Sequence, residues 1–532
     1  MSEKPVATDF EVGQDNITPF GLDIHNPVFL ISGLSIVAFV LITLMFQQGA
    51  AEFFAWLRPA ITSTFDWFFL SAGNLFVIFA FVVCVSPLGR VRLGGQTATP
   101  DYSYVGWFSM LFAAGMGIGL MFFGVSEPMS HFGSSMGGIA IGDNGIRTDW
   151  APLGAAAGNV EAATNLAMAA TIYHWGLHPW SMYAVVALAL AFFSFNHNLP
   201  LTLRSAFYPL LGDRVWGWPG HLIDTIAVFA TLFGLATSLG FGTQQALAGF
   251  NFLYGWGTGS VAIVVLIVFI TAIAIGSVVR GLDGGVKLLS EVNMGLALLL
   301  LSFIFIVGPT GDILITMVSG AGAYVKEFIP LSMPFGREDA NFSQGWTSFY
   351  WAWWISWSPF VGMFIARVSR GRTVREFLTC VILVPTALCI LWMATFGGTA
   401  LSQVIADAAA PVASAAQEVK LFHMLDGFPF SSLLSLIGIV LVLVFFVTSS
   451  DSGSLVIDTI TAGGKIDAPV SQRIFWCSFE GLVAAVLLLV GGAEALGALQ
   501  AMAVSTGLPF TIVLLTMCVS LWLGLSKASK AI

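Results

Sequence analysis

Residues 350–364 read YWAWWISWSPFVGMF and hold four tryptophans, Trp351, Trp353, Trp354 and Trp357. Trp353 and Trp357 are four residues apart and Trp354 and Trp357 are three apart, so a helix would carry them as one aromatic stripe. Indole faces attract cations, and a quaternary ammonium or sulfonium group, which has no N–H to donate, is bound best by a cage of such faces. The stripe therefore predicts a site for a methylated cation.

A second aromatic group lies in HWGLHPWSMY, residues 174–183. Trp180 and Tyr183 are three residues apart on one helical face, and Trp175 precedes the Pro179 kink. The alternative to a binding site is an aromatic belt at the membrane interface.

The glycine-rich stretch GMGIG, residues 115–119, falls inside an apolar run. Glycine tolerates unusual dihedral angles and weakens helices, so a helix could break here. At Gly117 and Gly119, freed N–H groups could receive a carboxylate, while freed carbonyls could bind a cation. The alternative is close helix packing through small residues. A break beside a tryptophan cage would suit a zwitterion.

Hydroxyl groups gather in FFVTSSDSGS, residues 445–454, where Thr448, Ser449 and Ser450 offer oxygens to a hard cation such as Na⁺. The alternative is hydrogen bonding back to helix carbonyls. Carboxylates are nearly missing from the third to tenth apolar runs: Asp224 and Glu291 are placed near span starts, and Asp451 just past the end of the tenth. We therefore expect the cation to be held by aromatic rings and not by a carboxylate.

Composition sets the class of protein. Of 532 residues, 57% are hydrophobic and only 9% are charged, too few to cover a soluble globule of this size. The five cysteines are isolated, which predicts inert thiols and no disulfide or metal site. The net charge of −9 is spread over short loops, and no nucleic-acid partner is expected. The sequence predicts an all-α polytopic membrane protein in contact with a lipid bilayer.

Twelve apolar runs approach the roughly 20 residues that cross a hydrocarbon core. They lie at 27–46, 65–86, 104–125, 177–195, 221–245, 259–279, 286–308, 346–368, 376–397, 429–449, 471–491 and 501–524. Residues 161–175 and 311–329 are expected to form amphipathic or interfacial helices outside that count.

Both termini are expected in the cytoplasm. With the N-terminus inside, fifteen of the twenty Lys and Arg residues fall on the cytoplasmic side. The other five are Arg58, Arg147, Lys326, Arg337 and Lys420.

GMGIGLMFFGVSEP, HWGLHPWSMY and YWAWWISWSPFVGMFIARVSRGRTVREF resemble the signatures of the betaine/choline/carnitine transporter family, and the resemblance covers essentially all twelve spans. It implies a leucine-transporter-like fold with an inverted repeat of two five-helix units, spans 3–7 and 8–12, after two extra helices. The expected parts are a cytoplasmic tail (1–25), the two additional helices (26–100), the first repeat (101–310), an interfacial helix and loop (311–345), the second repeat (346–524) and a short cytoplasmic tail (525–532).

The resemblance also implies roles for particular residues. The substrate residues would be Trp175, Trp180, Tyr183, Trp353, Trp354, Trp357 and Phe364, with Gly117 and Gly119 from the glycine motif. The principal Na⁺ site would comprise Ala113, Met116, Phe445, Thr448 and Ser449. Thr231 and Phe360 match a proposed second Na⁺ site, but that site uses two threonines one turn apart, and here Leu235 follows Thr231.

Three couplings are known in such a family. Proton-coupled choline members place an aspartate at the last position of the glycine motif, which here is Gly119, and sodium-independent carnitine or betaine exchangers use an arginine of the fifth span, where this chain has none. The sequence thus favours Na⁺ symport of a zwitterion, glycine betaine or dimethylsulfoniopropionate, by alternating access, with Na⁺ as coupling ion and no other cofactor. A channel or membrane enzyme would need a polar pore or a catalytic cluster. We expect a homotrimer in a bacterial cytoplasmic (inner) membrane, from the resemblance.

Overall fold

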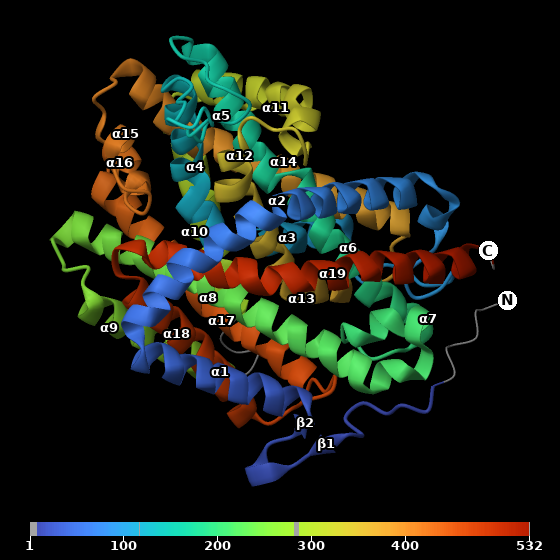
Figure 1. Cartoon of the computed structure of the whole chain (residues 1–532). Helices are drawn as coiled ribbons and strands as arrows, with labels where there is room; N and C mark the ends of the chain where they lie inside the picture. The colour runs from blue at the N-terminus through green and yellow to red at the C-terminus, as the bar shows by residue number, and fades with distance from the viewer. Residues whose placement is uncertain (1–7, 116, 281–286, 531–532) are drawn as a thin grey trace.

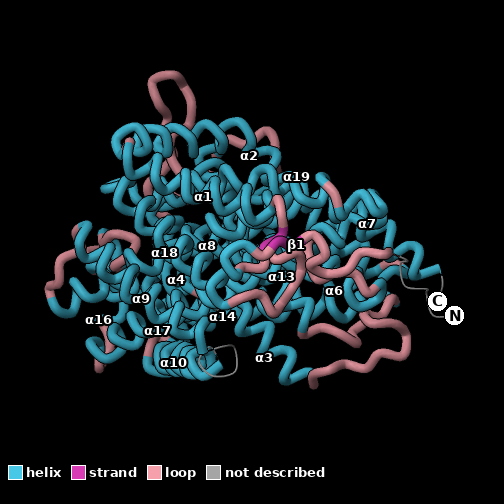
Figure 2. The backbone as a smooth tube through the Cα atoms, turned by 90° about the horizontal axis from the view of Figure 1, so that it is seen from below, coloured by secondary structure: helices cyan, strands magenta, loops and turns pink. Residues whose placement is uncertain are grey.

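The computed structural model describes residues 8–115, 117–280 and 287–530, and helices account for most of them (Figures 1 and 2). The long helices of the first half are α1 (Val28–Met45), α2 (Gln47–Val85), α3 (Tyr104–Gly115), α4 (Ile118–Met136), α5 (Val160–Trp175), α6 (Leu177–His197), α8 (Trp218–Tyr254), α9 (Ser260–Arg280) and α10 (Lys287–Val307). Those of the second half are α11 (Thr310–Ser332), α13 (Ser348–Arg367), α14 (Val374–Ala406), α17 (Ser431–Thr461), α18 (Val470–Gly491) and α19 (Ala495–Lys530).

Short elements connect the long helices. They are η1 (Pro19–Gly21), η2 (Pro87–Arg90), η3 (Arg204–Phe207), α7 (Tyr208–Leu211), η4 (Gly212–Trp216), α12 (Ala340–Phe342), the π-helical turn η6 (Ser343–Thr347), α15 (Pro411–Ser414), α16 (Lys420–Asp426) and η7 (Gly492–Glu494). The strands β1 (Asn16–Ile17) and β2 (Ile24–His25) form an antiparallel pair in which Asn16 faces His25.

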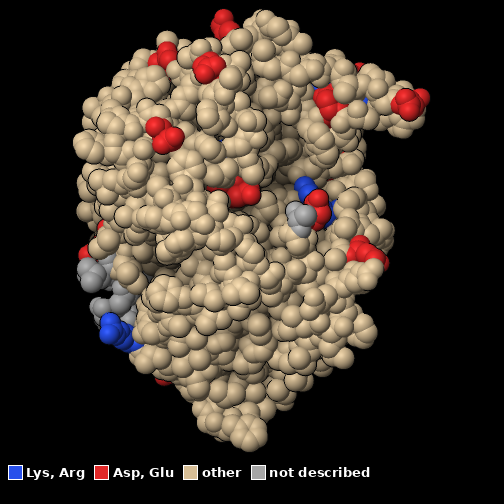
Figure 3. Space-filling view, turned by 90° about the vertical axis from the view of Figure 1, so that its left-hand side faces the viewer, with Lys and Arg blue, Asp and Glu red and all other residues tan. Residues whose placement is uncertain are grey.

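The outer surface of the helix bundle is apolar. Large hydrophobic side chains such as Leu34, Val261 and Val318 are more than half exposed, and the space-filling view shows wide areas without charged side chains (Figure 3). Apolar surface of this extent has to be covered by lipid or by another protein. The chain is an all-α polytopic membrane protein.

Ten helices among the described residues are long and apolar enough to cross a membrane, and the bent pair α3 and α4 makes an eleventh if it counts as one span. The expected span at 346–368 is α13, a 20-residue helix whose tryptophans, serines and proline lower its hydropathy. It packs against α6, α8 and α19 and lies near the middle of the bundle (Figures 1 and 2). The inverted-repeat relation between the two groups of helices stays a prediction.

The expectation of an interfacial helix at 161–175 is wrong. Helix α5 packs against α4, α11 and α14, and every residue from Ala167 to Trp175 is buried. The segment is rich in alanine, and small side chains let helices approach closely on several faces. Because residues 161–175 contain few large apolar side chains, the sequence did not indicate that this helix is buried inside the bundle.

The third apolar run is interrupted as the glycines suggested. Helix α3 and helix α4 are bent by 68° at a break of a few residues. Gly117 precedes the first residue of α4 with extended backbone angles, φ −167° and ψ −177°. Met116, which was predicted to bind Na⁺, lies outside the described residues. The break leaves the carbonyl end of α3 and the N–H end of α4 without helical partners.

A buried ion pair joins η3 to α8. The guanidinium of Arg204 donates to the carboxylate of Asp224, which also accepts the backbone N–H of Arg204 at 3.2 Å. The two side chains are 3% and 0% exposed. By contrast, the pair Arg370–Asp101 is 47% and 42% exposed.

Removing the buried carboxylate should destabilise the protein. Asp224→Asn leaves the Arg204 charge buried without a counter-charge, which typically costs about 3–5 kcal/mol. We expect a clear fall in the thermal unfolding temperature of the purified protein in detergent. The control Asp101→Asn breaks an exposed pair worth only about 0–1 kcal/mol and should shift that temperature little. Equal shifts for the two variants would contradict this reading of the buried pair.

Candidate functional site: two cavities beside a helix break

A cavity of about 440 Å³ lies where α4 begins, between α5, α6, α8 and α13. Seven of the nine predicted substrate residues line it. They are Gly117, Gly119, Trp175, Tyr183, Trp353, Trp354 and Trp357, and the other lining residues are Ile118, Leu120 and Ser238. We call this space the aromatic pocket. The two remaining predicted residues lie elsewhere: Trp180 packs behind the pocket, and Phe364 lines a second cavity.

The rings of the aromatic pocket meet at steep angles. The ring of Trp354 lies 5.3 Å from that of Trp175 at an interplanar angle of 79°, and 5.0 Å from that of Tyr183 at 60°. Trp180 supports both from behind, 5.5 Å from Tyr183 and 6.0 Å from Trp354 between ring centroids. Rings set at these angles line one pocket from several sides, and the electron-rich faces of such rings attract a compact methylated cation.

Hydrogen bonds from the indoles to α8 fix two of these rings. The Trp353 indole donates to the hydroxyl of Ser238 at 3.0 Å, and the Trp357 indole donates to the carbonyl of Gly234 at 2.9 Å. A buried tryptophan usually needs a partner for its N–H, so these bonds set the ring planes. Ser238 was not predicted from the sequence, because a single serine in an apolar helix gives no signal.

The backbone at Gly119 touches the pocket walls. A Cβ atom at this position would stand 2.7 Å from Cη2 of Trp353 and 2.8 Å from Cη2 of Trp175, too close for either ring to stay in place. A Cβ atom at Gly117 would meet nothing within 4 Å. Close approach of backbone and indole edges therefore requires glycine at 119 and not at 117.

A second cavity, of about 760 Å³, lies on the other side of Trp357, whose side chain lines both spaces. The residues predicted for the principal Na⁺ site lie here, apart from Met116: Ala113, Phe445, Thr448 and Ser449. The cavity is also lined by Ser290, Asn293, Met294, Phe360, Val361, Phe364 and Ser452. We call it the hydroxyl cavity.

Oxygen atoms are available in the hydroxyl cavity. The Thr448 hydroxyl donates to the carbonyls of Val444 and Phe445 at 3.0 and 3.3 Å, which leaves its lone pairs free to accept or to ligate. The side-chain oxygen of Asn293 is buried without a hydrogen-bond partner among the described residues. Hard cations such as Na⁺ prefer oxygens of this kind. Asn293 was not predicted from the sequence, because a single asparagine in an apolar run gives no signal of ion binding.

The two ends of the broken helix face different cavities. Ala113, near the carbonyl end of α3, lines the hydroxyl cavity, whereas Ile118 and Gly119 at the N–H end of α4 line the aromatic pocket. A helix carries partial negative charge at its carbonyl end and partial positive charge at its N–H end. The break thus favours a cation in one cavity and a carboxylate in the other.

The second Na⁺ site, predicted from the resemblance at Thr231 and Phe360, stays a prediction. Phe360 lines the hydroxyl cavity, but Thr231 is not among the described residues that line either cavity. The Thr231 hydroxyl donates to the carbonyl of Ala227 in its own helix at 2.7 Å.

The prediction that spans three to ten are nearly free of carboxylates is wrong. Helix α4 continues to Met136, so Glu127 lies inside it, and Glu127 is 0% exposed. Likewise α17 continues to Thr461 and encloses Asp451, which is 5% exposed. Glu127 and Asp451 each lie two residues beyond the end of an apolar run. A charged residue lowers the local hydropathy, so the apolar run ends there although the helix continues.

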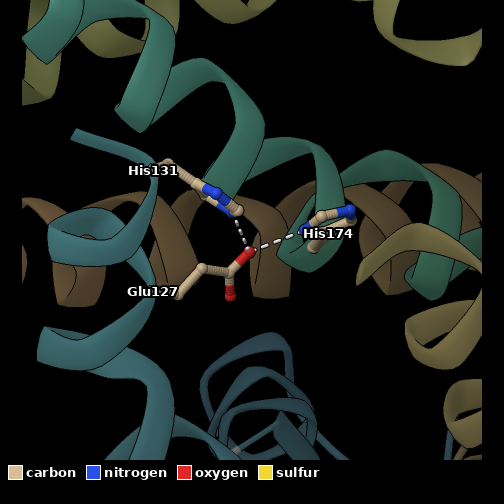
Figure 4. Close-up of side chains that lie close together, drawn as sticks. All are labelled: Glu127, His131 and His174. Carbon is tan, nitrogen blue, oxygen red and sulfur yellow. Dashed lines mark hydrogen bonds and ion pairs between the residues drawn. The ribbon is translucent and has the colours of Figure 1, made fainter. Parts of the chain in front are cut away.

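The Glu127 carboxylate lies directly behind the aromatic pocket and accepts four hydrogen bonds. Its Oε2 accepts from the Trp175 indole at 2.7 Å and from the Tyr350 hydroxyl at 2.5 Å. Its Oε1 lies 2.6 Å from Nδ1 of His174 and 3.2 Å from Nε2 of His131 (Figure 4). The signal in the sequence was the spacing of Glu127 and His131, four residues apart on one helical face.

Glu127, His131 and His174 could also be considered as metal ligands, since one ligand atom from each lies within 4.8 Å of the others. The ligand atoms of a tetrahedral zinc ion stand about 3.3 Å apart. Here Nδ1 of His174 is only 2.6 Å from the carboxylate oxygen, which is a hydrogen-bond distance. The cluster fits a hydrogen-bonded carboxylate and not a metal centre.

A helix bundle with an aromatic pocket beside a broken helix is typical of membrane carriers that bind their solute inside the bundle. The chain belongs to the betaine/carnitine/choline transporter family (BCCT), whose family model matches residues 27–530. It is a transporter and not an enzyme, and it is a multi-pass membrane protein of a bacterial transporter family.

Curated relatives from Vibrio parahaemolyticus agree with this assignment. A glycine betaine/proline/choline transporter is 64% identical over 98% of this chain and 94% of that protein. Glycine betaine transporter 1 is 54% identical over 98% of this chain and 97% of that protein. A glycine betaine/proline/choline/ectoine transporter is 56% identical over 98% and 91%.

A methyl group at position 119 should impair the aromatic pocket. Gly119→Ala places Cβ against two indole edges that are held by hydrogen bonds, so we expect substrate affinity to fall by about tenfold or more, since displaced rings lose cation contact. Gly117→Ala adds the same methyl group to open space and should cause a much smaller loss. Binding of substrate to the purified variants measures both. Similar losses for the two variants would contradict the close approach at Gly119.

Proposed function

We propose that the protein imports a methylated zwitterion, glycine betaine in the first place, by Na⁺ symport with alternating access. Dimethylsulfoniopropionate, whose sulfonium group is recognised by the same ring faces, is the alternative substrate. The protein would lie in the bacterial cytoplasmic membrane with both termini in the cytoplasm and assemble as a homotrimer. Proton-coupled choline uptake and sodium-independent exchange are the competing couplings.

The observation that most strongly supports the proposal is that the break between α3 and α4 borders both the aromatic pocket and the hydroxyl cavity. The methylated cation would lie against Trp175, Trp354 and Tyr183, and its carboxylate would face the N–H end of α4. Na⁺ would lie in the hydroxyl cavity near the carbonyl end of α3, with Thr448 and Ser449 as ligands. Each ligand would stabilise the same arrangement of the break, so each would strengthen binding of the other by the same factor.

Substrate and coupling can be tested in one uptake experiment. Cells that lack their own carriers should take up labelled glycine betaine only when Na⁺ is present, and K⁺ should not replace Na⁺. The relative affinities of other substrates follow from how strongly each unlabelled compound inhibits this uptake. The compounds are dimethylsulfoniopropionate, carnitine, choline, proline and ectoine. Uptake that proceeds equally well without Na⁺, or that follows a pH gradient instead, would contradict Na⁺ symport.

The ligands of Na⁺ can be tested by a double variant. Thr448→Ala with Ser449→Ala removes two oxygens from the hydroxyl cavity, so we expect the Na⁺ concentration for half-maximal uptake to rise about tenfold or more. Substrate affinity at saturating Na⁺ should change much less. Thr243→Ala, which removes an α8 hydroxyl that donates to the Leu239 carbonyl and lines neither cavity, serves as the control. An unchanged Na⁺ requirement in the double variant would show that the ion binds elsewhere.

A further inference from the structure

We propose that Glu127 is a positioning and selectivity residue. Its buried carboxylate fixes the Trp175 ring and gives the aromatic pocket a negative electrostatic potential that favours cationic substrates such as choline. The proposal rests on the proposed function and deepens it, because it concerns which onium compounds the same pocket accepts.

Hydrogen bonding keeps Glu127 ionised. A carboxylate has about four lone-pair positions, and Trp175, Tyr350, His174 and His131 each supply a donor to one of them. An added acid proton would displace one of these donors and leave it buried without an acceptor.

The two histidines satisfy the cluster in their neutral forms. His174 donates from Nδ1 to Glu127, and its Nε2 lies 2.9 Å from the hydroxyl of Thr347, which can donate to it. His131 donates from Nε2, and its Nδ1 is buried without a partner among the described residues. Under the proposal both rings are neutral, and neither supplies a counter-charge to Glu127.

The basic side chain that approaches this region is already paired. Arg337 makes two hydrogen bonds to Asp339, at 2.8 and 2.9 Å, and both side chains are nearly buried. The positive charge of Arg337 is therefore balanced by Asp339 and does not neutralise Glu127. With both histidines neutral, the group formed by Glu127, His131 and His174 carries a net charge of about −1.

Trp175 connects this charge to the pocket. Its indole N–H is 2.7 Å from Glu127 Oε2, and its far edge lines the aromatic pocket beside Gly119. The carboxylate thus lies one indole away from a bound cation. At an effective dielectric constant of about 20, a unit charge at that separation changes the affinity for a monovalent cation by roughly tenfold or more.

The effect differs between substrates. Choline carries a single positive charge and gains the full attraction. Glycine betaine carries its own carboxylate, which the same charge repels, so its net gain is small. Gly119 provides no counter-charge beside a bound choline, but Glu127 provides one behind the Trp175 ring. The Glu127 carboxylate behind the Trp175 ring would thus take the place of the aspartate that proton-coupled choline members carry at the position of Gly119.

The test uses the purified transporter in proteoliposomes with saturating Na⁺. Inhibition constants of unlabelled choline and unlabelled glycine betaine are measured against labelled glycine betaine uptake, and their ratio is the readout. Glu127→Gln should raise the choline-to-betaine ratio by about tenfold. Glu127→Asp keeps the charge and should leave the ratio within about threefold, although both affinities fall as Trp175 loosens. Tyr350→Phe removes one donor without changing the charge and should also preserve the ratio.

The outcomes separate the proposals. Failure of the wild type to import betaine refutes the proposed function and, with it, this inference. Normal betaine import with no inhibition by choline refutes the charge role alone. An equal loss of both affinities in Glu127→Gln also refutes it, since a purely structural role acts on every substrate. Should that variant not reach the membrane, His131→Lys places a compensating cation against Oε1 and must raise the same ratio; an unchanged ratio there overturns the proposal.

Discussion

The interruption between α3 and α4 is the feature on which the rest of the site depends. In a low-dielectric interior, backbone groups without partners are costly, so a helix can open only where its free ends face polar ligands or cavities. Ala113 on one side and Ile118 with Gly119 on the other line different cavities. A single break therefore creates both a place for a cation and a place for an anion, and it makes the two sites neighbours.

The walls of the aromatic pocket are rigid because polar groups far apart in the chain hold them. Trp353 and Trp357 belong to α13 but donate to Ser238 and to the carbonyl of Gly234 in α8. Trp175 belongs to α5 but donates to a carboxylate of α4. Cation–π attraction depends on where the ring faces point, so these bonds matter more to recognition than their individual energies suggest.

Local spacing explains what could be predicted. The separations of three and four residues among Trp353, Trp354 and Trp357 predicted the face that lines the pocket, and the glycines predicted the position of the break. Contacts between distant segments carried no such signal. The bond from Tyr350 to Glu127 spans 223 positions, and the approach of Gly119 to Trp353 exists only once α4 and α13 are packed together. The burial of α5 was hidden for the same reason, since alanines reveal their partners only in three dimensions.

Burying Glu127 is costly in itself, and the cost is offset only because α4, α5 and α13 all contribute donors to it. The carboxylate is thus satisfied in one relative arrangement of these three helices. In that arrangement the pocket lies between two opposing electrostatic sources, the negative charge behind Trp175 and the positive end of α4 at Gly119. A cation is drawn to the first and a carboxylate to the second. The selectivity of the pocket between zwitterions and simple cations then follows from the balance of these two fields and not from the aromatic rings, which attract every methylated cation alike.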